Sequence, residues 1–134
     1  MTMDTYLIEG FYLYNGARGK LTGEIELNSN GQFESIITDH MSRVPEQIFK
    51  GQIRNIGEIT RLEFFKYPPS ANLANLAYQL EKSKSDDFSG KYTGQWGALP
   101  YKIEFDLDLG LLLANVVMSV CEIGDSAELN LSRR

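Results

Sequence analysis

Tyrosine is the residue type in this sequence that most readily suggests a binding site. The chain holds seven tyrosines and one tryptophan, and most of them fall on the apolar side of segments that alternate like strands. A buried tyrosine needs a partner for its hydroxyl, so several tyrosines that converge in one lumen would give an apolar cavity with a few polar groups. We therefore expect a small, mainly apolar ligand to be bound by Tyr12, Tyr14, Phe64, Tyr78, Tyr92, Trp96 and Tyr101. The alternative is that these rings simply fill the interior, because a barrel of about eight strands is just wide enough for either arrangement.

Asp39 and His40 form the only pair that suggests a general base. Neighbouring residues of a strand point to opposite faces, so the two side chains need not meet, and no serine or cysteine nucleophile is arranged with them. We expect His40 at the surface. The one cysteine, Cys121, lies in an apolar segment and is expected in the core. The sequence therefore predicts no catalytic residues, and an enzyme is the less favoured class.

Acidic residues are placed as they are on a solvated sheet face. Glu104, Asp106 and Asp108 lie on one side of a strand-like segment, and Glu24 with Glu26 makes a second such row. Hard cations usually need several oxygen ligands that converge from a loop, which these rows do not offer. We expect neither a metal nor a cofactor.

The elements that must position the aromatic residues are strands. In residues 101–109 every odd position is apolar and every even one is charged, and residues 88–96 place Phe88, Tyr92 and Trp96 on one face. We predict these two segments to be adjacent strands. Further strands are expected at residues 5–14, 18–27, 32–39, 46–55, 58–66, 111–123 and 127–132. The first of them is apolar on both faces, which suggests that it is covered twice or paired with another chain.

Turns are signalled at several links. Asn15-Gly16 is typical of a two-residue hairpin, residues 28–31 form a second turn, and Pro68-Pro69 must end a strand. The segment 70–83 fits either a short helix after Pro69 or a loop followed by a strand from about Leu76 to Lys82. The strand is preferred because its neighbours on both sides are strands.

Glycine recurs on the apolar faces, in the pattern apolar-x-Gly-x-apolar. Gly23, Gly51, Gly90 and Gly94 are examples, and such glycines permit sharp coiling or close approach of a neighbouring strand. The sequence therefore predicts an all-β fold, a single antiparallel up-and-down barrel of about eight to ten strands. Gly94-Gln95-Trp96 resembles the Gly-x-Trp step of lipocalins and avidins, which makes the barrel calycin-like. In those families the step lies on the first barrel strand, so we infer a shared structural device and no membership.

The totals set the remaining expectations. A length of 134 residues suits one domain spanning 1–134, and a net charge of −5 disfavours nucleic acid and anionic membranes as partners. No apolar run is long enough to span a membrane, no secretory leader is evident, and a single cysteine is typical of the cytoplasm. The alternative to ligand binding is a filled barrel that forms a homo-oligomer through Leu7, Phe11, Leu13 and residues 111–117.

Overall fold

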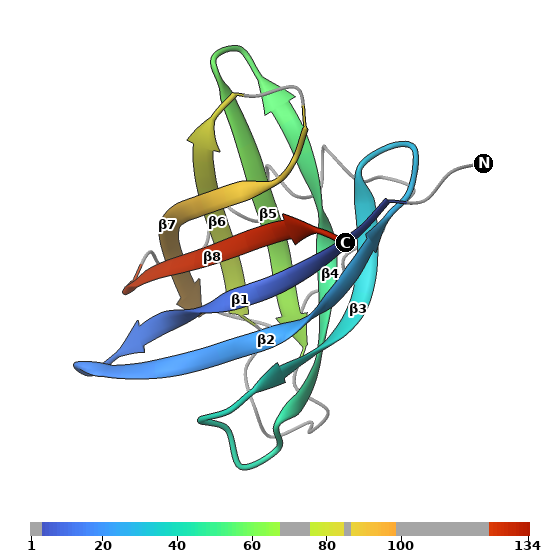
Figure 1. The fold of residues 1–134 in the computed structure, drawn as a ribbon. Coiled ribbons are helices and arrows are strands. Elements are labelled where there is room, and N and C mark those ends of the chain that lie inside the picture. The colour runs from blue at the N-terminus through green and yellow to red at the C-terminus, as the bar shows by residue number, and fades with distance from the viewer. Residues whose placement is uncertain (1–3, 68–75, 85–86, 99–123) are drawn as a thin grey trace.

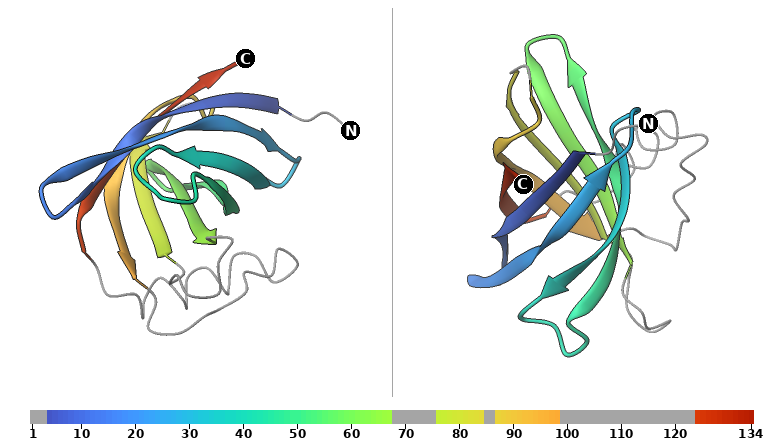
Figure 2. Two further views of the ribbon diagram at one scale, coloured as in Figure 1. Left: turned by 90° about the horizontal axis from the view of Figure 1, so that it is seen from below. Right: turned by 45° about the vertical axis from the view of Figure 1, so that its right-hand side comes forward.

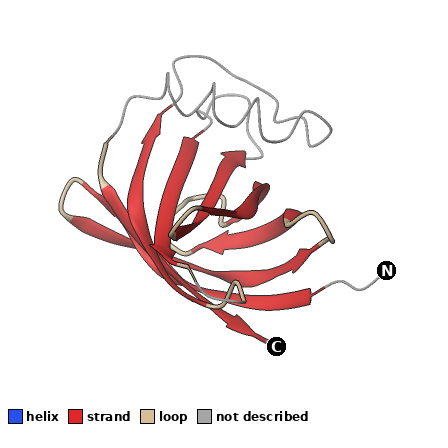
Figure 3. Ribbon diagram, turned by 90° about the horizontal axis from the view of Figure 1, so that it is seen from above, coloured by secondary structure: helices blue, strands red, loops and turns tan. Residues whose placement is uncertain are grey.

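The structure is a computed structural model, and it describes residues 4–67, 76–84, 87–98 and 124–134. These residues form eight strands and no helix (Figure 3). The strands are β1 (Asp4–Tyr14), β2 (Ala17–Leu27), β3 (Gln32–Asp39), β4 (Glu46–Ile56), β5 (Ile59–Tyr67), β6 (Leu76–Ser83), β7 (Gly90–Ala98) and β8 (Ser126–Arg133).

The eight strands make a closed antiparallel barrel in which each strand pairs with the next along the chain (Figure 1). The barrel closes where β8 returns to β1, over the register from Tyr6 opposite Arg133 to Tyr12 opposite Ala127 (Figure 2). The predicted all-β, up-and-down barrel is therefore confirmed, at the lower end of the expected strand number.

The first hairpin shows how local sequence sets the register. Asn15 and Gly16 have φ values of 49° and 82°, the left-handed pair that a tight hairpin turn requires. With the turn fixed, Tyr14 lies opposite Ala17 and Tyr12 opposite Gly19. The alternation along β1 then directs Tyr6, Ile8 and Tyr12 into the barrel and leaves Leu7 outside.

The second half of the chain contributes β6, β7 and β8 to the barrel. Residues 76–83 form β6, as the preferred alternative predicted, whereas the helix alternative for residues 70–75 lies outside the described residues. β7 pairs with β6 on one edge and with β8 on the other. The predicted strand over residues 101–109 lies outside the described residues, as do residues 111–123, Tyr101 and Cys121.

Gly51 and Gly94 have the geometric role that their positions suggested, whereas a Cβ on Gly90 would meet only the Lys82 side chain, at an ordinary contact distance. A Cβ on Gly51 would collide with the backbone oxygen of Glu63 and with the Cβ of Phe64, its partner on β5. A Cβ on Gly94 would likewise collide with the backbone oxygen of Gln79 on β6. Neighbouring strands can coil this tightly only where a side chain is missing, because any Cβ would occupy the space of the adjacent backbone.

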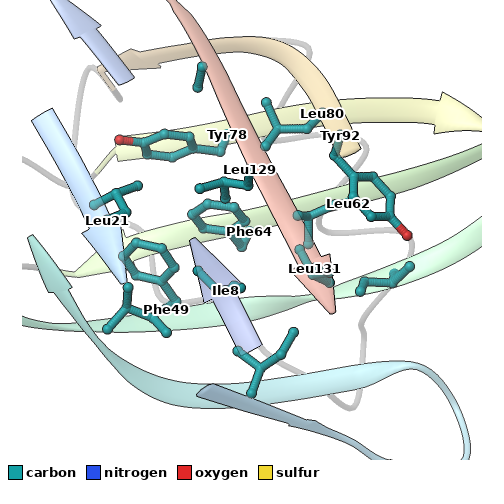
Figure 4. Close-up of a cluster of buried hydrophobic side chains, with 14 of the residues drawn as sticks. Ile8, Leu21, Phe49, Leu62, Phe64, Tyr78, Leu80, Tyr92, Leu129 and Leu131 are labelled. Atoms are coloured by element: carbon teal, nitrogen blue, oxygen red, sulfur yellow. The ribbon is translucent and has the colours of Figure 1, made fainter. Parts of the chain in front are cut away.

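A stack of aromatic rings fills the middle of the barrel (Figure 4). Phe64 lies between Phe49 and Tyr78, with ring centroids 4.5 Å and 4.6 Å apart, and all three side chains are buried. Tyr92, Leu129 and Leu131 continue the core beyond this stack. Among the described residues, this packed core separates the two ends of the barrel.

Candidate functional site

A cavity of about 420 Å³ lies at one end of the barrel. This is the end at which β1, β3, β5 and β7 finish and β2, β4, β6 and β8 begin. The lining residues come from those strand ends and from the link between β3 and β4. Among the described residues they are Tyr12, Tyr14, Asp39, Met41, Ser42, Gln47, Lys66, Leu76, Trp96 and Ala98.

Strand register brings three polar residues to the floor of this cavity. Asp39 continues the buried alternation of β3, Gln47 begins that of β4, and Lys66 continues that of β5. Lys66 on β5 lies opposite Phe49 on β4. Gln47 is two residues before Phe49, on the same face of β4. Since side chains two apart on a strand share a face, all three point inward at the same end of the barrel.

Asp39 is the centre of the polar floor. The Tyr12 hydroxyl donates to the carboxylate, at 3.0 Å from Oδ1 and 2.9 Å from Oδ2, and Lys66 Nζ lies 2.6 Å from Oδ2. The backbone N–H of Met41 donates to Oδ1 over 3.0 Å. The side chains of Asp39 and Lys66 are only 2% and 4% exposed, so this is a buried, well-bonded ion pair.

The pKa values of two of these groups move because the groups are buried. Burial lowers the pKa of Lys66 below its ordinary value of 10.5, and the Asp39 carboxylate partly offsets this effect. Burial also raises the pKa of Tyr12, and its hydrogen bond to Asp39 adds to the rise. Tyr12 is therefore neutral at physiological pH. Asp39 and Lys66 are the only charged residues among the described lining residues, so their opposite charges balance.

Two buried oxygens near the site lack a hydrogen-bond partner within the described residues. The Gln47 amide donates from Nε2 to Ser42 Oγ at 3.0 Å and to the Val44 carbonyl at 3.2 Å, but its Oε1 accepts nothing. The hydroxyl of Tyr78 is also buried without a partner, and burial raises its pKa well above 10.0. An unsatisfied buried polar atom costs free energy, and Gln47 is one of the residues that line the cavity.

The walls of the cavity are apolar and aromatic. The rings of Tyr12 and Trp96 meet edge to face, with centroids 5.8 Å apart. The ring centroids of Tyr14 and Trp96 are 6.1 Å apart. Trp96 Nε1 donates to the Leu13 carbonyl at 3.0 Å, which fixes the indole. Gly19 makes room for Tyr12, because a Cβ there would collide with the tyrosine ring. The arrangement suits an apolar molecule with one polar end.

The predicted ligand-binding residues fall into separate places. Tyr12, Tyr14 and Trp96 line the cavity. Phe64 and Tyr78 belong to the packed stack of the core. Tyr92 is buried towards the other end of the barrel, where its hydroxyl donates to the Phe88 carbonyl over 2.5 Å. Tyr101 lies outside the described residues.

Sequence reasoning missed Asp39, Gln47 and Lys66 as parts of a site. The signal was present, because each continues the every-second-residue pattern of an apolar strand face at the same end of its strand. Asp39 was considered only together with His40. The two side chains do point apart, and His40 is exposed with Nε2 2.7 Å from Thr22 Oγ1, so its predicted surface position is confirmed.

Comparison with known proteins gives no relative: no family model, no curated protein and no solved structure matches this chain. Within the described strands and loops, His, Cys, Asp and Glu side chains form no group of three or more that could hold a metal ion. The described residues also include no helix with the length and apolar character needed to cross a membrane.

Proposed function

We propose that this protein is a calycin-like, non-enzymatic binding module that holds a small, mainly apolar molecule at one end of its barrel. The observation that carries the proposal is the cavity of about 420 Å³ between Tyr12, Tyr14 and Trp96. Its volume falls within the range of about 300–1,000 Å³ that is common for small-molecule sites. Apolar walls above a single polar floor would orient a ligand with one polar end.

The two sequence-based alternatives apply to different parts of the barrel. Phe49, Phe64 and Tyr78 fill the middle, as a packed interior requires. Beyond them the wall residues leave a cavity, which supports binding at the barrel end. Catalysis is less well supported, because Tyr12, Lys66 and the backbone of Met41 already share the Asp39 carboxylate.

Fluorescence offers a direct test, because Trp96 is the only tryptophan and lines the cavity. We expect the neutral apolar probe N-phenyl-1-naphthylamine to quench Trp96 emission with saturation at one probe per chain. Native mass spectrometry of freshly purified protein should detect any retained small molecule in the same stoichiometry.

A matched pair of variants locates the binding site. Ala98→Phe adds a ring to the cavity wall and should weaken probe binding at least tenfold, whereas Ser83→Phe, at the far end of β6, should not change it. A probe that fails to saturate, or one that Ala98→Phe does not weaken, would refute the proposal.

A homo-oligomer built on outer strand faces is the second candidate. Ile36 and Ile48 face each other across β3 and β4 with 63% and 38% of their surfaces exposed, and Leu7 on β1 is 46% exposed. Phe11, named in the same prediction, is covered in part by the Arg18 guanidinium 4.2 Å from its ring. Sedimentation of the wild type and of Ile36→Lys tests this: a strict monomer at high concentration would reject it. The cytoplasmic location stays a prediction.

A further inference from the structure

The polar floor of the cavity points to a particular kind of ligand head group. We infer that it selects an uncharged group that both donates and accepts a hydrogen bond, such as the hydroxyl of an apolar alcohol, and that it disfavours carboxylates and ammonium groups. This inference rests on the proposed binding function and adds the ligand class to it.

Charge balance is the first step. The Asp39 carboxylate and the Lys66 ammonium are 2.6 Å apart and nearly inaccessible to water, and the described lining contains no other charge. A carboxylate ligand would approach Lys66 only by approaching Asp39 as well, and an ammonium ligand would meet the converse problem. Either would bring an uncompensated charge next to this buried ion pair, which is unfavourable, whereas a neutral group keeps the balance.

Unused hydrogen-bonding capacity is the second step. An ammonium group has three N–H donors, and among the described residues Asp39 Oδ2 is the only acceptor of a hydrogen bond from Lys66. Gln47 Oε1 is an acceptor with no partner in the same part of the chain, and because almost none of its surface is accessible, a ligand reaches it only when the amide turns towards the cavity. The floor thus offers a ligand one type of donor and one acceptor. A hydroxyl satisfies both, since its oxygen can accept from Lys66 while its hydrogen is donated to Gln47.

Position on the sheet is the third step. Phe49 lies directly opposite Lys66, and Gln47 is two residues before Phe49 on the same face. Such diagonal neighbours on adjacent strands are about 7–8 Å apart at the backbone, a separation that two long side chains can bridge through one small group. Both residues line the cavity, so the rest of the ligand would lie against Trp96, Tyr14 and Leu76.

Four probes, each with eight carbon atoms, test the inference by titration of Trp96 fluorescence at pH 7. They are 1-octanol, octanoate, octylammonium and 1-methoxyheptane, the last an isomer of octanol that accepts but cannot donate. We expect octanol to bind at least tenfold more tightly than either ion and several-fold more tightly than the ether. Octanoate or octylammonium binding as tightly as octanol would overturn the inference while leaving the binding function intact, whereas failure of every probe, including N-phenyl-1-naphthylamine, would refute both.

Variants of Gln47 identify the atom responsible. Gln47→Met keeps an unbranched side chain without the amide oxygen, so octanol and 1-methoxyheptane should bind it equally. Gln47→Glu adds a negative charge to the floor and should shift the preference at least tenfold towards octylammonium. Ser83→Ala, at the opposite end, should leave all four affinities unchanged, and thermal melting checks that each variant folds. A persistent preference for octanol over the ether in Gln47→Met, or an unchanged preference in Gln47→Glu, would contradict the assignment.

Discussion

At the scale of single residues, Asp39 organises the candidate site. Its carboxylate accepts hydrogen bonds from the Tyr12 hydroxyl, the Lys66 ammonium and the backbone of Met41. These donors come from β1, β5 and the link after β3, so one side chain fixes three parts of the barrel end relative to one another. Burial makes that arrangement sensitive, because each partner that is removed leaves a charge or dipole without compensation.

Removal of Lys66 alone should therefore be costly. In Lys66→Met the Asp39 carboxylate stays buried without its counter-ion, and we expect the free energy of unfolding to fall by about 3–5 kcal/mol. The double variant Asp39→Asn/Lys66→Met removes both charges and should lie within about 1–2 kcal/mol of the wild type. Urea unfolding followed by Trp96 fluorescence measures both. Equal losses in the single and double variants would show that the ion pair itself is not the cause.

At the scale of the strands, the sequence predicts which segments pair but not everything that faces inward. The apolar alternation of β2 to β4 and the turn at Asn15 and Gly16 determine faces and register locally, so these elements could be predicted. Asp39 and Lys66 could not be placed with equal ease, because a charged residue at a strand end is normally solvated. Asp39 and Lys66 are 27 residues apart in the sequence, and only the closed barrel brings their opposite charges together.

The same limit applies to the choice of partners for β7. Residues 88–96 and 101–109 follow each other with matching patterns, and short links usually join strands that pair. In the barrel both edges of β7 are taken by β6 and β8. Which of several suitable strands closes a sheet depends on the total strand number and tilt, and no local pattern contains that information.

Glycine provides the prediction at this scale. Gly51→Ala places a methyl group against the Glu63 carbonyl and the Phe64 side chain, and backbone cannot move aside as a flexible side chain can. We expect a loss of about 3 kcal/mol in the free energy of unfolding, at the upper end of the range for overpacked sites. Gly57→Asn is the matched control: Gly57 has a φ of 57°, which asparagine tolerates, and a Cβ there would meet nothing within 4 Å. Thermal or urea unfolding should show little change in Gly57→Asn, and an equally stable Gly51→Ala would contradict the close-approach argument.

At the scale of the whole molecule, buried tyrosine hydroxyls occur along the length of the barrel interior. Tyr12, Tyr78 and Tyr92 are spread along it, and burial is the largest cause of the raised pKa of each hydroxyl. Folding therefore favours the protonated form of all three tyrosines. Stability must then depend on pH in the alkaline range.

We expect the protein to lose stability above pH 10. Each of the three tyrosines has a folded pKa above the ordinary value of 10.0, so above that pH the unfolded chain releases protons that the folded chain keeps. The free energy of unfolding should fall by up to about 1.4 kcal/mol per pH unit for each tyrosine. Lys66 acts in the opposite direction only below 10.5, because its folded pKa is lowered.

Absorbance at 295 nm and circular dichroism measured along one alkaline titration test this dependence. The absorbance change of the buried tyrosines should appear together with unfolding and not before it. Tyr92→Phe should reduce the pH slope of stability by about one third. Full tyrosine ionisation in a chain that is still folded would contradict the expected dependence.

The pairing of the first strand with the last has a mechanical consequence. Because β1 and β8 run antiparallel with Tyr6 opposite Arg133, the start of one strand lies beside the finish of the other. A force that pulls those two points apart in an optical trap would break the hydrogen bonds between β1 and β8 one after another. It would not load all of them in shear at the same time. We expect this molecule to yield at low force when held by its ends, and to resist far more when gripped at residues 4 and 126, where the same hydrogen bonds would be loaded in shear.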